Sequence, residues 1–235
     1  MKNFFKSKLS NLKLRWARTS PKRYINYLRK KGVIIGDNLW ITPDVKSLKI
    51  DTTRPSLLTI GNHVRLNRNL TIITHDGGFY VLKNKYNEFI SQSGRVCIGN
   101  NVYFGRNCSV FKGVTIGDNV IIGNGSIITK DIPSNSVAVG TPARVVSSIE
   151  EYYNKRKALY VEEALDYARS IQERFNRRPR IEEFWEEFPL FLNGDDECPE
   201  LPIKQQMGDA YNFYKNNNKA VFNGFEDFLK QAGIE

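Results

Sequence analysis

The sequence predicts a mainly β protein built as a parallel β-helix, with a helical segment at each end. A six-residue apolar period through residues 98–133 predicts the β-helix. A change of composition on either side of the repeat, basic before it and charged and aromatic after it, predicts the helical ends. We therefore expect a basic N-terminal helical segment at 1–32, a β-helix at 33–146 and an α-helical region at 147–235.

The net charge of +10 is concentrated at the N-terminus. Residues 1–36 hold eleven Lys or Arg and no Asp or Glu, which leaves 24 basic against 25 acidic residues in the rest of the chain. Spacings of four, three and four put apolar side chains on one face of a predicted amphipathic helix and basic residues around its other sides. The apolar face consists of Phe5, Leu9, Leu12 and Trp16.

A second short helix is expected to follow, capped by Thr19 or Ser20, with Pro21 in its first turn and a stop at Gly32. Two interpretations of the N-terminal helices stay open, and they are compatible. In the first, the helices form a lid on the open end of the β-helix. In the second, residues 1–31 contact anionic lipid or a lipid-linked glycan. Nucleic acid is disfavoured as a partner, because no recognised motif or row of stacking aromatics accompanies the charge.

The hexads carry an aliphatic residue or Phe at position one and a small or β-branched residue at position five. A period of six fits neither a helix nor an alternating strand, but it fits short strands joined by tight corners. Gly stands at position two in four of the six hexads, and we expect it to supply unusual dihedrals at the corners. The inward residues should be Ile98, Phe104, Val110, Ile116, Ile122 and Ile128 at position one, and Val102, Cys108, Val114, Val120, Ser126 and Ile132 at position five.

The same signature recurs upstream from Ile35 and from Ile60, so roughly four to five coils are expected. The phase breaks after Ile72 and resumes at Ile98, which indicates a loop insertion at 76–95. Loops that project from a rigid repeat are common places for functional sites. One of the two histidines of the chain, His75, stands at the start of this insertion.

After Val146 the spacing of apolar residues predicts a helix from Ile149 to Phe175, and the segment IEEFWEEF resumes that helical pattern. A loop is expected around Asn193, and helical spacing returns between residues 211 and 229. We interpret this region as a small helical domain without identifiable chemistry.

The three cysteines lack metal-site spacing, and Cys108 occupies an inward position, so no disulfide is expected. No apolar run approaches the ~20 residues that span a bilayer, and the N-terminus lacks the features of a secretory signal. We therefore expect a cytoplasmic protein.

Residues 33–146 resemble the hexapeptide-repeat acyltransferases, which include galactoside, maltose and xenobiotic acetyltransferases and many polysaccharide O-acetyltransferases. The run VTIGDNVIIGNGSIITKDIPSNSVAVGTPARVV, from Val114 to Val146, is similar to the closing coil of that family, whose Thr-Lys and Pro-Ala-Arg elements flank coenzyme A. The resemblance implies a left-handed coil, a homotrimer and acetyl-CoA as donor. No metal is expected, because the related zinc enzymes need three His per zinc and this chain has two His in total.

The stretch IGNHVRLNRNLTIITHD resembles the family segment that leads into the catalytic histidine, which makes His75 the expected general base. His63, twelve residues earlier, falls on a different face of the coil and is expected at the surface or between subunits. For the acceptor, the resemblance points to Asn69, Asp51 and Asp76 as residues that bind sugar hydroxyls or orient the base. Ordinary turn residues at β-helix corners are the alternative.

The resemblance also carries over a set of residues that contact coenzyme A. Arg106 departs from the family pattern, because a small residue there would leave more room for the pantetheine arm. Arg144 suits the 3′-phosphate of the coenzyme. The full set is Tyr103, Arg106, Asn124, Thr129, Lys130 and Arg144.

The leading functional prediction is O-acetylation of a sugar hydroxyl in a polysaccharide or lipid-linked glycan precursor, of the kind used for capsule or lipopolysaccharide. Two alternatives remain at this point. One is acetylation of a small soluble acceptor such as a free sugar, serine, an amino-sugar nucleotide or an antibiotic. The other is a non-enzymatic trimeric scaffold.

Overall fold

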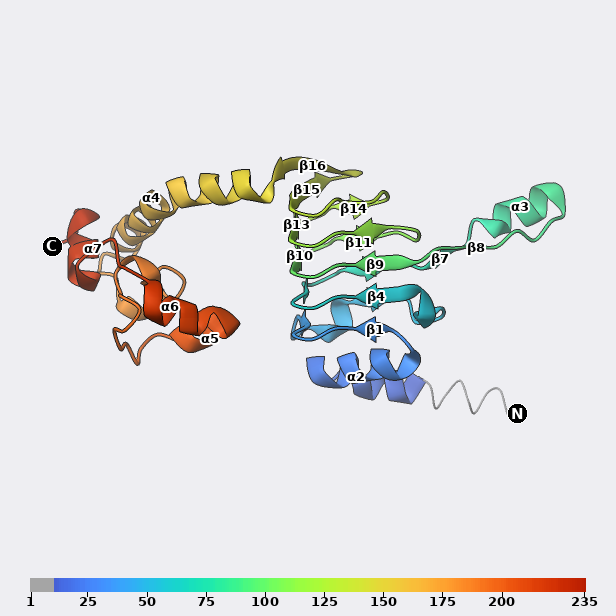
Figure 1. Ribbon diagram of the computed structural model, residues 1–235, viewed down its shortest axis with the longest axis horizontal. Helices are drawn as coiled ribbons and strands as arrows, with labels where there is room; N and C mark the ends of the chain where they lie inside the picture. Colours follow the sequence, from blue (N-terminus) through green and yellow to red (C-terminus); the bar gives the residue numbers. More distant parts are fainter. Residues whose placement is uncertain (1–10) are drawn as a thin grey trace. The chain divides into compact units, whose positions relative to one another are not determined.

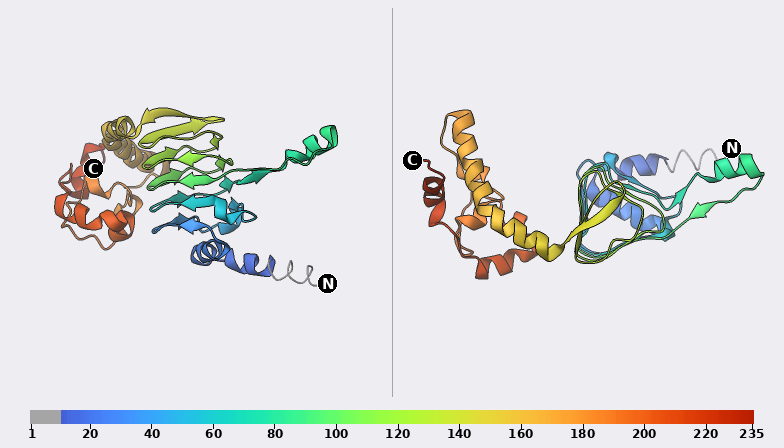
Figure 2. Two further views of the ribbon diagram at one scale, coloured as in Figure 1. Left: turned by 45° about the vertical axis from the view of Figure 1, so that its right-hand side comes forward. Right: turned by 90° about the horizontal axis from the view of Figure 1, so that it is seen from above.

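The computed structural model describes residues 11–235 and divides the chain into two compact units that meet between Tyr152 and Tyr153. The first unit contains a parallel β-helix, in which short strands stack into three sheets (Figure 1). Viewed along the coil axis, successive coils superpose on one another around a common interior (Figure 2). The predicted parallel β-helix is therefore confirmed.

Each sheet collects one strand from every coil. The first sheet contains β1 (Ile34–Ile35), β4 (Leu58–Ile60), β9 (Val96–Ile98) and β12 (Thr115–Ile116). The second contains β2 (Trp40–Ile41), β5 (Arg65–Leu66), β10 (Val102–Phe104), β13 (Val120–Ile122), β15 (Ser136–Gly140) and β16 (Ala143–Ser148). The third contains β3 (Lys49–Ile50), β6 (Thr71–Ile72), β11 (Ser109–Val110) and β14 (Ile127–Ile128). All neighbours within these sheets are parallel except β15 and β16, which form an antiparallel hairpin.

The interior of the coils is filled by the two inward positions of each hexad, as predicted. All twelve of these residues are buried, including Phe104, the Cys108 thiol and the Ser126 hydroxyl. The Ser126 hydroxyl donates to the Gly123 carbonyl at 2.7 Å, which satisfies its polar group inside the core. Strands of the inner coils pair with the coil on either side, and the buried apolar residues of successive coils form one continuous cluster.

The predicted role of glycine at position two was wrong. These glycines have ordinary dihedrals, and they are required because coils approach closely: a Cβ on Gly99 would lie 2.7 Å from the backbone carbon of Gly117. The left-handed corners fall instead at position four, where asparagine and one histidine have φ between 54° and 61°, and where Gly113 and Gly125 have φ of 80° and 73°. These corner residues include Asn38, His63, Asn69, Asn101, Asn107 and Asn119.

At the N-terminus, α2 (Pro21–Lys31) begins at Ser20, whose side chain accepts from the Arg23 N–H, and it ends at Gly32 with φ 104°. Both predicted ends of this helix are confirmed. Its buried residues Tyr24 and Leu28 belong to the same apolar cluster as the coils, which supports the lid interpretation.

Residues 11–17 are also helical, and their exposed side chains include Leu12 and Trp16. Of the apolar face predicted for the first helix, Phe5 and Leu9 lie outside the described residues.

The insertion forms an arm rather than an irregular loop. Strands β7 (His75–Asp76) and β8 (Gln92–Ser93) pair antiparallel, and α3 (Phe79–Tyr86) forms the tip. The arm projects from the β-helix (Figure 1), and α3 has no buried residue. Two 3₁₀ turns, η1 (Val45–Ser47) and η2 (Pro55–Leu57), lie in earlier loops.

The second unit begins within α4 (Ile149–Phe175), which has the predicted bounds. The expected helix over IEEFWEEF is wrong, because the segment contains one 3₁₀ turn, η3 (Ile181–Glu183), and its last residue begins another, η4 (Phe188–Leu190). Pro189 disfavours a continuous helix there, because it lacks an N–H donor and its ring clashes with the preceding turn. The remaining elements are α5 (Ile203–Met207), η5 (Gly208–Ala210), α6 (Tyr211–Asn217) and α7 (Gly224–Gln231).

An aromatic core holds this unit together. The Phe184 ring lies at the centre of the core, 5.2 Å from the Phe228 ring and 5.1 Å from that of Tyr167. Ion pairs join its periphery, for example Arg177 with Glu183, which holds the pKa of that carboxyl down at about 2.

Candidate active site

His75 lies where the third sheet meets the arm. Residues 71–74 continue the strand direction of β6, with Ile72 and Thr74 buried, and His75 then pairs with Ser93 as the first rung of the arm. Its side chain is 35% exposed, so the imidazole is held by the fold and still reaches solvent.

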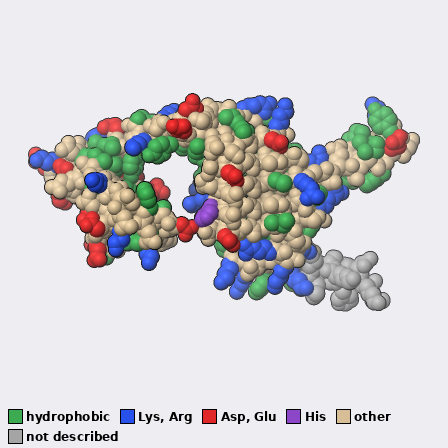
Figure 3. All heavy atoms as spheres, in the orientation of Figure 1, with side chains coloured by type: hydrophobic (Ala, Val, Ile, Leu, Met, Phe, Trp, Pro, Cys, Tyr) green, Lys and Arg blue, Asp and Glu red, His purple; other side chains and the backbone are tan. Residues whose placement is uncertain are grey.

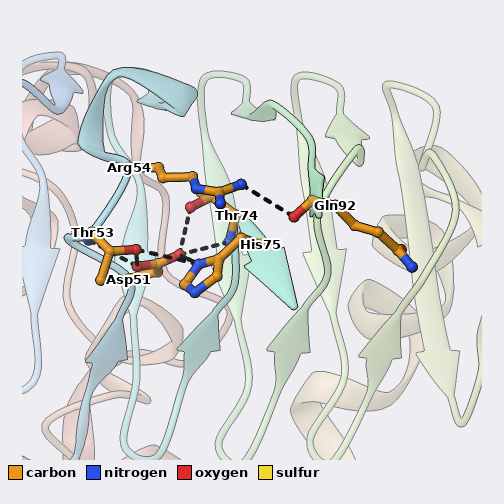
Figure 4. Close-up of polar contacts among 6 residues, drawn as sticks. All are labelled: Asp51, Thr53, Arg54, Thr74, His75 and Gln92. Atoms are coloured by element: carbon orange, nitrogen blue, oxygen red, sulfur yellow. Dashed lines mark hydrogen bonds and ion pairs between the residues drawn. The ribbon is translucent and has the colours of Figure 1, made fainter. Parts of the chain in front are cut away.

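The imidazole is oriented by Asp51, which follows β3 in the preceding coil (Figure 4). His75 Nδ1 lies 2.6 Å from Asp51 Oδ2. Because a carboxylate can only accept, Nδ1 carries the proton, and Nε2 of the neutral ring keeps a lone pair. The pair therefore presents a base whose tautomer is fixed by its partner.

Two threonines hold Asp51 in place. Thr74 donates through its hydroxyl to Asp51 Oδ2 at 2.5 Å, and Thr53 donates through its backbone N–H and its hydroxyl to Oδ1 at 2.9 and 2.7 Å. Partial burial by itself would raise the pKa of Asp51, but the hydrogen bonds from Thr74, Thr53 and His75 outweigh it and hold that pKa well below its ordinary value. Asp51 is therefore an anion at neutral pH.

Asp76 is engaged differently. Its carboxylate accepts from Lys112 Nζ at 2.7 Å and from the Gly78 N–H at 2.9 Å, and these contacts lower its pKa. Lys112 follows β11 in the next coil. The pair thus ties the base of the arm to the coil that stacks on it.

Two of the predicted coenzyme residues share this end of the third sheet. The Phe111 N–H donates to the Ile128 carbonyl at 3.0 Å, so the register of β11 and β14 continues beyond the strands. It brings Thr129 and Lys130 alongside Phe111 and Lys112. Both Thr129 and Lys130 are exposed.

The other predicted residues lie elsewhere in the chain. Arg106 and Asn124 stack at the corner that precedes the third sheet, where Asn124 Oδ1 accepts from the Arg106 N–H at 2.6 Å. Asn69 is at the same kind of corner and donates to Asn107 Oδ1 at 2.8 Å. Tyr103 and Arg144 belong to the second sheet, on β10 and β16. One chain therefore does not gather all the predicted site residues.

His63 occupies a left-handed corner before β5. The register of the second sheet aligns it with Asn101 and Asn119, which stand at the same corner in later coils. It is exposed and lies on a different corner from His75, in agreement with its predicted position at the surface.

Sequence reasoning missed Thr53, Thr74 and Lys112. Thr53 stands two residues after Asp51, a spacing typical of an aspartate that accepts from the backbone in a turn, so this contact had a local signal. Thr74 and Lys112 approach the site through stacking between coils, which no local pattern reveals.

The comparisons with known proteins agree with this fold. The family described as the hexapeptide repeat of succinyl-transferase matches residues 95–130. Protein CapG of Staphylococcus aureus is 39% identical over 148 residues, covering 61% of this chain and 79% of CapG. The chain belongs to the hexapeptide-repeat acetyltransferase family.

Galactoside O-acetyltransferase of Escherichia coli strain K12 is 34% identical over 147 residues, covering 54% of this chain and 71% of that enzyme. The structure of a maltose O-acetyltransferase from Clostridium difficile 630 is 27% identical, with a TM-score of 0.43, covering 60% of this chain and 84% of that one. The resemblance that the sequence suggested is confirmed, and the protein is an acetyltransferase of this family. None of the helices in the described residues is both long and apolar enough to cross a membrane.

Proposed function

We propose that the protein transfers an acetyl group from acetyl-CoA to a sugar hydroxyl of a polysaccharide or lipid-linked glycan precursor. The Asp51–His75 pair at the base of the arm is the observation that carries this proposal, since it supplies an oriented base at the protein surface. The similarity to a galactoside O-acetyltransferase supports a sugar as the acceptor.

In the proposed reaction, His75 Nε2 takes the proton of the acceptor hydroxyl as its oxygen attacks the thioester carbonyl carbon. The C–S bond then breaks, and the proton passes from the imidazolium to the leaving thiolate. Asp51 keeps the ring in the required tautomer and stabilises the imidazolium that forms, as a positioning residue. Transfer is direct within a ternary complex, so no acyl-enzyme is needed.

We further propose that Lys130 and Arg144 bind phosphates of the coenzyme and that Tyr103, Arg106, Asn124 and Thr129 line its channel. Thr129 and Lys130 share the end of the third sheet with His75, whereas Tyr103 and Arg144 lie on the second sheet. We propose that the coil is left-handed and that the protein is a homotrimer in which neighbouring subunits complete each site. This assembly would bring the residues of the third sheet together with those of the second sheet of a neighbour. Asn69 and Asp76 remain proposed acceptor residues.

Contact of the N-terminal helices with the inner face of the cytoplasmic membrane is the last part of the proposal. Exposed Lys and Arg gather around α2 (Figure 3), and Leu12 and Trp16 are 61% and 62% exposed nearby. Each cation near an anionic surface contributes about 1 kcal/mol. In this assignment 1–32 is the contact and lid segment, 33–146 is the catalytic β-helix and 147–235 is an accessory helical region.

The function is tested by incubating the protein with acetyl-CoA and glycan intermediates from cells while following thiol release and acceptor mass. His75→Ala should lower kcat by about 100-fold or more while folding and coenzyme binding persist, because His75 is the base and is not part of the core. His63→Ala is the matched control and should stay within about threefold of the parent. Loss of activity in His63→Ala with activity retained in His75→Ala would mean that the active site lies at the corner of His63 instead. A preference for free sugars or serine as acceptors would favour the alternative of a small soluble acceptor.

A further inference from the structure

A cationic side chain is hydrogen-bonded to the arm strand that pairs with the strand of His75, and it has no role in the mechanism above. Arg54 lies in the loop between β3 and β4, and its Nη1 donates to the Gln92 carbonyl at 3.1 Å. Gln92 is next to Ser93, which is the register partner of His75 across the arm. Figure 4 shows the Arg54 guanidinium pointing toward the Gln92 carbonyl, in the same close-up as the Asp51–His75 pair.

The acidic groups of this region already have partners. Asp51 accepts from Thr53, Thr74 and His75, and Asp76 pairs with Lys112. Over residues 11–235, Arg54 has no carboxylate oxygen within 4.0 Å. Within this described part of the chain, its guanidinium is bound by a backbone carbonyl and by no carboxylate, although it carries five N–H donors in a planar fork.

We propose that Arg54 binds a carboxylate of the acceptor, so that the acceptor is an acidic sugar such as a uronic acid residue in a glycan. A guanidinium fork matches a carboxylate in bidentate geometry, and such charged hydrogen bonds are among the strongest in proteins. Its anchoring to β8 holds the fork in place, which lowers the entropy lost on binding. This inference rests on the proposed function, since it assigns the substrate class of the same site.

The test compares a panel of acidic oligosaccharides with their methyl esters, which have the same hydroxyls and lack the charge. The parent protein should have a kcat/KM at least about tenfold higher for the acids, and Arg54→Gln should lower that value by about 10- to 100-fold. Turnover of the esters should stay within about threefold, and Arg54→Lys should restore part of the acid preference. Arg68→Gln is the control, because Arg68 is also an exposed arginine but its charge already faces a carboxylate. Its Nε lies 3.9 Å from Asp44 Oδ2.

Each other outcome contradicts the inference in a distinguishable way. Equal losses on acids and esters would mean that Arg54 only anchors the arm. A raised KM for acetyl-CoA with unchanged acceptor KM would mean that Arg54 binds a coenzyme phosphate. Parent turnover of the esters equal to that of the acids would remove the acidic acceptor but leave the proposed function intact. No acyl transfer to any acid or ester would overturn both.

Discussion

At the scale of single residues, positions two and four of the hexad do different physical work. Glycine at position two permits contact between coils, and asparagine at position four adopts the left-handed corner. The corner amides also bond from coil to coil, as when Asn101 Nδ2 donates to Asn119 Oδ1 and Asn119 Nδ2 to Asn135 Oδ1, both at 2.9 Å. Both demands recur with the period of the repeat, and this explains the repeated glycine at position two and the repeated asparagine or glycine at position four.

Gly99→Ala should therefore destabilise the β-helix. Its new Cβ would lie 2.6 Å from Asp118 Oδ1 and 2.7 Å from the Gly117 backbone, so neighbouring coils must separate. We expect a loss of about 1–3 kcal/mol in the free energy of unfolding, measured with denaturant. Gly77→Ala is the matched control, because nothing lies within 4 Å of its Cβ. Equal stability of the two variants would contradict the stacking explanation.

Asp51→Asn tests whether this residue positions the base. An amide can donate to Nδ1 as well as accept from it, so the imidazole loses its fixed tautomer, and kcat should fall by about tenfold or more. The KM for acetyl-CoA should change little. Asp44→Asn, at an exposed corner, should have no effect on kcat. If Asp51→Asn instead raises only the acceptor KM, Asp51 binds the acceptor.

The same variant should change the response to acid. The folded state holds the pKa of Asp51 below its unfolded value, so the stabilisation is present above the usual aspartate range near 4 and is lost as pH falls below it. Unfolding measured between about pH 6 and 3 should show a shallower loss of stability for Asp51→Asn than for the parent. Equal slopes would contradict the low pKa.

The sequence predicted the core residues of the β-helix better than the contacts of the candidate active site, for physical reasons. Inward positions follow the period, so all twelve could be assigned. His75 was predicted from a resemblance, and Asp51 was predicted with two roles left open. The contacts of Thr74 with Asp51 and of Lys112 with Asp76 join neighbouring coils, so they depend on register. The reason for the position-two glycines was missed because close approach between coils depends on stacking, which a single hexad does not show.

At the scale of elements, the helical ends were predicted where local signals exist. Ser20 and Gly32 are standard helix-end residues and mark α2 correctly. The arm was predicted only as an insertion, because its two-residue strands are too short for a pattern to show. IEEFWEEF has helical spacing, yet it forms a 3₁₀ turn at 181–183 and a second that begins at Phe188, because Pro189 disfavours a continuous helix.

The N-terminal segment offers a test at this scale. Tyr24 and Leu28 are buried while Lys13, Arg15, Lys22 and Lys30 are exposed, so the exposed charges can be reversed without disturbing the lid. Changing these four to Glu should abolish binding to anionic vesicles and leave turnover of a soluble acceptor unchanged, since each cation contributes about 1 kcal/mol. Vesicle flotation measures the binding.

Its control reverses four exposed lysines of the second unit, Lys155, Lys157, Lys215 and Lys219, which changes the net charge equally. If both quadruple variants lose binding to anionic vesicles equally, net charge alone explains the binding. Binding that is insensitive to ionic strength would also count against a membrane surface.

At the scale of the whole molecule, the distribution of the proposed site residues predicts an assembly of subunits. His75 and Lys130 lie at the end of the third sheet, and Arg144 lies in the β15–β16 hairpin of the second sheet. A triangular coil presents these sheets on different faces, so a single coenzyme would contact both groups most readily between subunits. Light scattering at micromolar concentration should therefore give the mass of a trimer.

Co-expression of two variants would test the shared site itself. His75→Ala should lose about 100-fold or more of its activity at any donor concentration, and Arg144→Ala should be weak at low acetyl-CoA because the proposed contact with a coenzyme phosphate is missing. If the two residues of a site come from adjacent subunits, random mixing of the variants restores both native residues in about one quarter of sites. If both come from the same subunit, every site lacks one of them. Recovery of about a quarter of parental activity at low donor would thus support the shared site, and activity no higher than the average of the two variants would rule it out.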